Sequence, residues 1–113
     1  MAEERIIERY LSTIMQNDYK GLAECFSETC HYVDTCPGTI SGVNYHLYGT
    51  KALEMFFHNK FTFQRISISD YVIEDDRHVN FFVSTRGYYI FARATIERFS
   101  PEGLIDVLTV RAG

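Results

Sequence analysis

Apolar residues recur in two different patterns along the chain, and the change of pattern divides it into a helical half and a strand-forming half. Between Glu3 and Asn17 they recur every three to four residues, which places them on one stripe of a helix. The members of this stripe are Ile6, Ile7, Tyr10, Leu11, Ile14 and Met15. The same spacing predicts a short second helix after Asp18, its N-cap, and a third helix over 50–61.

The second half carries β-branched and aromatic residues between turn signals. Such runs are typical of strands, and short turns between them favour antiparallel neighbours. The expected strands of this meander are 62–74, 78–86, 88–99 and 104–111. An earlier strand is expected over Cys30–Asp34, followed by an irregular stretch over 35–48 with one proline and two glycines. Helices followed by strands, without alternation, predict an α+β fold.

The chain has 113 residues, 46% of them apolar, and a net charge of −4. This size predicts a single domain over 1–113, and the acidic balance argues against nucleic acid or an anionic membrane as a partner. No apolar stretch has the length of a signal peptide or a membrane span, so we expect a cytoplasmic protein. The cysteines at 25, 30 and 36 match no CxxC pair or common zinc spacing, so we expect buried small side chains, no metal and no cofactor.

The order of elements is similar to that of the nuclear-transport-factor-2-like (NTF2-like, cystatin-like cone) superfamily, in which a strongly curved sheet wraps around the helices and encloses a pocket. The segments Glu8–Leu11, Asn17–Phe26 and Val33-Asp34 resemble the opening of ketosteroid isomerases and SnoaL-like polyketide cyclases. Tyr10 and Asp34 are 24 residues apart, which matches the oxyanion-hole tyrosine and general-base aspartate of the isomerases.

The resemblance implies a cofactor-free acid–base isomerase or cyclase that abstracts a proton next to the carbonyl of a small polar compound. Asp34 would be the base, and Tyr10 and a protonated Glu97 would donate hydrogen bonds to the developing oxyanion. Glu97 stands where the isomerases carry an aspartate, and Thr35 and Phe57 stand where they carry a proline and a tyrosine.

A reason for Glu97 to be neutral comes from the turn over 100–103. A four-residue loop there places Glu97 opposite Asp106, and two neighbouring carboxylates raise the pKa of one of them. A three-residue loop shifts the register and removes this effect.

Pairing extrapolated from the Arg86-Gly87 turn divides the last strands into two faces. One face is half polar and carries His78, Asn80, Phe82, Phe91, Arg93, Thr95 and Glu97. The other is apolar and carries Val79, Phe81, Val83, Ile90, Ala92, Ala94 and Ile96. If the polar face lines the pocket, the ligand is polar or anionic, and the apolar outer face packs against a second copy in a homodimer. The expected ligand-binding residues are Tyr32, Phe57, His78, Asn80, Phe82, Arg93 and Asp106.

Each of these residues also has a purely structural interpretation. Tyr10 on an apolar stripe is a core tyrosine, and Asp34 before a loop with proline and glycine is a turn residue. Glu97 faces solvent or pairs with Arg93 across a bend. His78 beside a turn is a surface histidine, or a general acid or base if it points inward.

Two further functions therefore stay open. Proteins with this fold also include ones without catalytic activity. The first alternative is therefore a ligand-binding or dimerisation module whose pocket uses Arg93, Asn80 and Tyr10 to hold an anion. The other is hydrolysis or dehydration, with His78 assisting Asp34.

Overall fold

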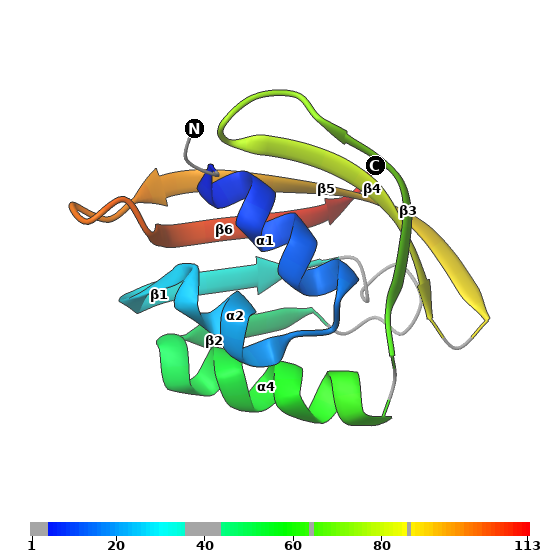
Figure 1. Ribbon diagram of the computed structural model, residues 1–113, viewed down its shortest axis with the longest axis horizontal. Coiled ribbons are helices and arrows are strands. Elements are labelled where there is room, and N and C mark those ends of the chain that lie inside the picture. Colours follow the sequence, from blue (N-terminus) through cyan, green and yellow to red (C-terminus); the bar gives the residue numbers. More distant parts are fainter. Residues whose placement is uncertain (1–4, 36–43, 64, 86) are drawn as a thin grey trace.

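The computed structural model describes residues 5–35, 44–63, 65–85 and 87–113, which form helices and a single sheet around one core (Figure 1). The helices are α1 (Ile6–Met15), α2 (Tyr19–Glu24) and α4 (Thr50–Phe63). The strands are β1 (Phe26–Asp34), β2 (Tyr45–Tyr48), β3 (Ser67–Ile73), β4 (His78–Thr85), β5 (Tyr88–Phe99) and β6 (Ile105–Ala112). The predicted α+β class is confirmed.

The two N-terminal helices form as their sequence patterns indicate. In the apolar stripe of α1, Ile7, Tyr10, Leu11 and Ile14 are buried, whereas Met15 at the end of the helix is exposed. The backbone N–H of Gly21 donates to Oδ1 of Asp18 over 3.0 Å, which is the predicted N-cap of α2. Between the helices, Asn17 adopts a left-handed conformation with φ of 53°. Its side-chain amide exchanges two hydrogen bonds with the backbone of Ile66, at 3.0 and 3.1 Å. The turn between α1 and α2 is thereby tied to the start of β3.

The sheet is mixed, with the strand order β2-β1-β6-β5-β4-β3. Strands β3 to β6 form the predicted antiparallel meander, and β1 pairs in parallel with β6. Two differences concern the first strands. β1 begins at Phe26 rather than Cys30, and β2, within the stretch expected to be irregular, pairs with the end of β1. Four residues beside glycines and a proline are too short a run to be recognised by alternation.

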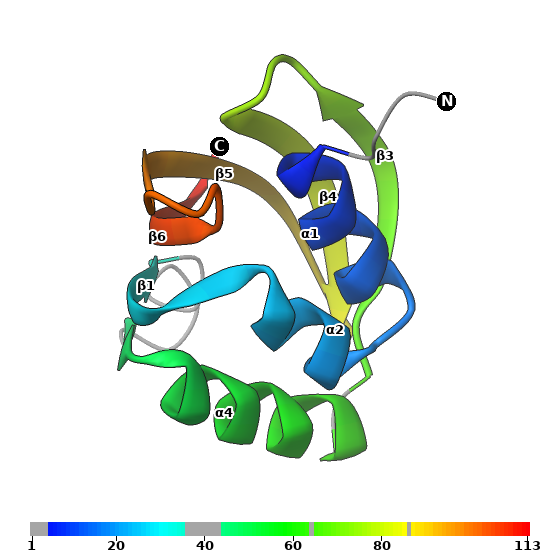
Figure 2. The ribbon, with the colours of Figure 1, turned by 60° about the vertical axis from the view of Figure 1, so that its left-hand side comes forward.

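The sheet curves around the helices, so that one face is covered by them and the other is left outside (Figure 2). The apolar side chains of β4 and β5 belong to the covered face and are buried in the core: Val79, Phe81, Ala92, Ala94 and Ile96. The prediction that this apolar face lies outside is therefore wrong. The apolar stripes of the helices need an apolar partner, and only this face of the sheet supplies one.

The cysteines in the described part of the chain behave as small core residues. Cys25 and Cys30 are buried free thiols, and burial raises the pKa of the Cys30 thiol. Cys36 lies outside the described residues. Across the described ranges, no helix has the length and apolarity needed to cross a membrane.

Candidate functional site

The inner face of β1 brings a hydroxyl and a carboxylate together. Alternate residues of a strand share one face, so Tyr32 and Asp34 point to the same side. The Tyr32 hydroxyl donates a hydrogen bond to Oδ2 of Asp34 over 3.2 Å. Tyr32 is buried, whereas Asp34 is partly exposed, so the carboxylate lies at the border between the core and the surface.

Tyr32 belongs to a chain of aromatic contacts that joins α1, β1 and α4. Phe57 of α4 meets the Tyr32 ring edge-on with 5.5 Å between centroids, and Phe26 does so at 6.3 Å. Tyr10 of α1, only 1% exposed, meets Phe26 edge-on at 6.4 Å. We call Tyr10, Phe26, Tyr32 and Phe57 the interior wall. Such edge-to-face pairs are favourable by about 0.5–1.5 kcal/mol beyond burial, so the interior wall is a packed unit with Asp34 at one end.

The polar residues expected beside this wall lie on the opposite face of the sheet. The pairing from the Arg86-Gly87 turn is as expected, since Asn80 pairs with Arg93 and Phe82 with Phe91. The face they share is the outer one, however, and a pocket that combines them with the interior wall is ruled out. The residues that this correction concerns are His78, Asn80, Phe82, Arg93 and Glu97.

His78 is an exposed residue of this outer face. Its Nδ1 lies 2.8 Å from Oδ1 of Asp75, and hydrogen bonds from the backbone of Arg77 and from the His78 side chain lower the pKa of that carboxyl. The surface interpretation of His78 is therefore correct, and an inward-pointing His78 beside Asp34 is not.

Glu97 and Asp106 do not face one another. The loop is the three-residue alternative: the Ser100 N–H donates to the Leu104 carbonyl over 2.7 Å, and Gly103 takes a left-handed φ of 83°. Two bulges follow, one at Glu97 in β5 and one at Asp106 in β6, because Ile96 pairs with Leu108, Arg98 with Val107 and Phe99 with Ile105. Glu97 is exposed, and the predicted carboxyl pair does not form.

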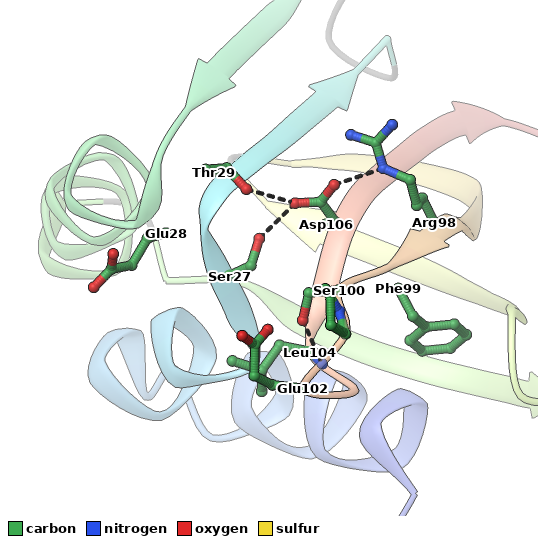
Figure 3. Close-up of a pocket in the computed structure, with 10 residues that line it drawn as sticks. Ser27, Glu28, Thr29, Arg98, Phe99, Ser100, Glu102, Leu104 and Asp106 are labelled. Carbon is green, nitrogen blue, oxygen red and sulfur yellow. Dashed lines mark hydrogen bonds and ion pairs between the residues drawn. The ribbon is translucent and has the colours of Figure 1, made fainter.

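Asp106 instead joins three strands (Figure 3). Its Oδ1 accepts hydrogen bonds from the hydroxyls of Ser27 at 2.7 Å and Thr29 at 2.9 Å, and its Oδ2 accepts one from Nε of Arg98 at 2.6 Å. The Ser27 bond, then Thr29 and Arg98, lower the pKa of Asp106. This carboxylate is therefore ionised at neutral pH.

A pocket of about 620 Å³ opens beside this cluster, between β1 and the loop that joins β5 to β6. Glu28 and Glu102 also line it, and the Arg98 side chain is 67% exposed (Figure 3). Sequence reasoning missed Ser27, Thr29 and Arg98. The alternate hydroxyls at 27 and 29 were the available signal, but they precede the expected start of the strand.

Comparison with known proteins identifies the fold. No family model matches the chain, and no curated protein matches it in sequence. Among solved structures, a proposed polyketide cyclase from Silicibacter sp. matches with a TM-score of 0.72 and 17% identity, over 96% of this chain and 86% of that one. A protein of ketosteroid-isomerase-like fold from Catenulispora acidiphila, solved with trimethylamine, matches with a TM-score of 0.68 and 11% identity, over 97% of this chain and 86% of that one. The fold is NTF2-like.

The NTF2-like fold also occurs within longer chains. OCP1 of Fremyella diplosiphon matches with a TM-score of 0.68 and 15% identity, over 98% of this chain but only 35% of that one. This chain therefore spans about a third of that protein's length. At these identities the likeness establishes the fold alone.

Within the NTF2-like fold, the predicted site residues fall into three places. Tyr10, Tyr32, Asp34 and Phe57 lie on the inner side, Asp106 lies in its hydrogen-bonded cluster, and the remaining five lie on the outer face. In the part of the chain that the structure describes, no three histidine, cysteine, aspartate or glutamate side chains are placed to hold a metal ion.

Proposed function

We propose that the protein is a cofactor-free acid–base catalyst that acts on a small carbonyl compound, with Asp34 as the general base. The observation that carries the proposal is the hydrogen bond between the Tyr32 hydroxyl and Oδ2 of Asp34. The Asp34 carboxylate takes up the proton next to the carbonyl, and the Tyr32 O–H, its one donor, turns from Oδ2 of Asp34 to the enolate oxygen and stabilises it.

The interior wall supports a substrate with an apolar body. The side chains beside Asp34 are aromatic, and the polar residues once expected there belong to the outer face. Glu97 has no part in the proposal for that reason. Tyr10 stays a candidate donor, to be tested by Tyr10→Phe.

Exchange of α-protons tests the proposal without knowledge of the natural substrate. Cyclohexanone in D2O, followed by ¹H NMR, reports any general base that reaches its α-carbon. We expect the unaltered protein to exchange the α-protons faster than the buffer does. In Asp34→Asn we expect the exchange rate to fall by about 100-fold or more, the lower end of what general-base catalysis contributes. Asp70→Asn makes the same chemical change at an exposed residue of β3 and leaves the rate unchanged. Exchange at the buffer rate, or full activity in Asp34→Asn, excludes Asp34 as the base.

One observation favours a second candidate, a ligand-binding module without chemistry. Tyr10 is packed edge-on against Phe26 in the core, as a purely structural tyrosine would be. Saturation-transfer NMR with the same ketone separates the two candidates. Binding of the ketone to the unaltered chain, without exchange of its α-protons, identifies the binding module.

We also propose that the protein is a homodimer through the outer sheet face at β1 and β2. What supports it is a row of rings left uncovered there: Tyr48 is 68% exposed and stacks on His31 at 4.3 Å, and His46 lies 6.0 Å from His31. The Nε2 of His31 is buried and has no hydrogen-bond partner among the described residues. Flat exposed rings on one face suit a second copy related by a two-fold axis.

Sedimentation velocity tests the dimer. Tyr48→Ser shifts the population toward monomer, because it removes the exposed ring of the row. Tyr71→Ser removes a comparably exposed tyrosine from β3 and leaves the population unchanged. A monomeric unaltered protein at 100-micromolar concentration, or equal effects of both variants, contradicts the proposed interface.

A further inference from the structure

A hollow on the outer face lies where β4, β5 and β6 run side by side. Its volume is about 560 Å³, and it is separate from the interior wall. The side chains that matter for its chemistry are Glu74, Asn80, Arg93, Thr95, Thr109 and Arg111. Most of them donate hydrogen bonds.

Two arginines and two threonines occupy adjacent cross-strand pairs in this hollow. Arg93 of β5 pairs directly with Arg111 of β6, and two residues along the strands Thr95 pairs with Thr109. Residues two apart on a strand share a face, and direct cross-strand partners have Cβ atoms about 4.5–5.5 Å apart. Two guanidinium groups and two hydroxyls therefore converge on one area of the sheet.

Like charges in direct cross-strand positions destabilise a sheet unless something compensates them. Within the described ranges, the side chains of Arg93 and Arg111 make no ion pair and no hydrogen bond to protein groups. Arg93 has one contact, with its guanidinium carbon 5.7 Å from the centre of the Phe91 ring. The hydrogen-bond donors of both guanidinium groups are thus available to a ligand.

Among the described residues, the nearby carboxylates form no ion pair with either arginine. Glu74 accepts a hydrogen bond from the Asn80 amide, and Asp75 is held by His78. Glu97 also lines the hollow, but it is four residues along β5 from Arg93, a separation of about 13 Å between backbone positions. Asn80 is the cross-strand partner of Arg93, so Glu74 is the one described carboxylate at this end of the hollow, and the two guanidinium groups outnumber it.

We propose that this hollow binds a small dianionic oxyanion, of the phosphate or dicarboxylate class. Arg93 and Arg111 each present a planar fork of N–H donors, which matches the paired oxygens of such a group. The hydroxyls of Thr95 and Thr109 donate to the remaining oxygens. Bound dianion also removes the repulsion between the arginines, so binding and sheet stability are coupled.

Titration of the full chain with inorganic phosphate, followed by ¹⁵N NMR, tests the site. We expect saturable shifts of the Thr95 and Thr109 amides, and an affinity about 10-fold or more lower in Arg93→Gln and in Arg111→Gln, since each loses charged hydrogen bonds. Arg65→Gln removes an exposed arginine outside the hollow and is the matched control. Malonate in a second arm identifies a dicarboxylate ligand, and acetate, with one charge, binds more weakly than either.

Three outcomes overturn the proposal. The first is the absence of saturation with both dianions. The second is an equal loss in Arg65→Gln, which indicates a diffuse effect of net charge. The third is that acidic side chains of a second copy of the chain occupy the hollow. In that case sedimentation shows that Arg93→Gln dissociates a dimer, and neither dianion binds.

Discussion

Phe57 is the residue of the interior wall whose truncation has the most direct effect on the free energy of unfolding. It is 3% exposed, and the centre of its ring lies 5.5 Å from that of Tyr32, 5.1 Å from that of Phe56 and 5.3 Å from that of Phe61. Phe57→Ala removes these contacts and leaves a cavity, which costs about 3–5 kcal/mol in comparable cores. A domain of this size has a free energy of unfolding of roughly 5–15 kcal/mol, so the loss is a large fraction of the total. We expect the melting temperature to fall by about 15 °C or more.

Urea unfolding followed by circular dichroism measures this loss, and the same helix provides its control. Phe63 also belongs to α4 but is 78% exposed, so Phe63→Ala makes the same change in helix propensity without opening a cavity. We expect a change of at most about 0.5 kcal/mol for an exposed position. If Phe63→Ala costs as much as Phe57→Ala, the assignment of Phe57 to a packed wall is refuted.

Two other predictions concern the loop and the cluster near the last turn. The folded-state pKa of Asp106 is lowered, so the contribution of its charge to the free energy of unfolding is complete above about pH 4 and is lost as the pH falls further. Asp106→Asn should therefore have a lower melting temperature than the unaltered protein at pH 7, and the difference in melting temperature should be smaller at pH 2.5. A Cβ at Gly103 would meet no atom within 4 Å, so Gly103→Ala costs only the left-handed conformation, about 1 kcal/mol by urea unfolding, and a cost near zero refutes the φ of 83°.

The helices and the meander could be predicted because their signals are local. Asp18 caps α2 with its own side chain, and the stripe of α1 repeats every turn. The short connection expected between Thr85 and Tyr88 predicted the pairing of β4 with β5, since one short loop fixes the register of both strands.

The candidate site was predicted less completely than the fold. The partners of its residues depend mainly on contacts between segments that are far apart in the sequence. The face of β4 and β5 that the helices cover is an exception, because its apolar side chains already indicate it as the partner of the apolar helix stripes. Counting residues through a loop fails at bulges, and those at Glu97 and Asp106 changed the partners of both acids. The link from Asp106 to Ser27 and Thr29 joins residues 79 and 77 positions apart, so no local pattern reveals it.

The parallel pairing of β1 with β6 has a consequence for how the chain folds during synthesis. Tyr32 pairs with Leu108, and Asp34 with Val110, so the strand that carries the proposed base has its central neighbour 76 residues further along the chain. Long loops must close before such contacts form, which slows folding and makes it cooperative. The pairing of β1 with β6 is therefore completed only after translation has passed residue 110. Until then, β1 and β5 both expose open edges to other nascent chains.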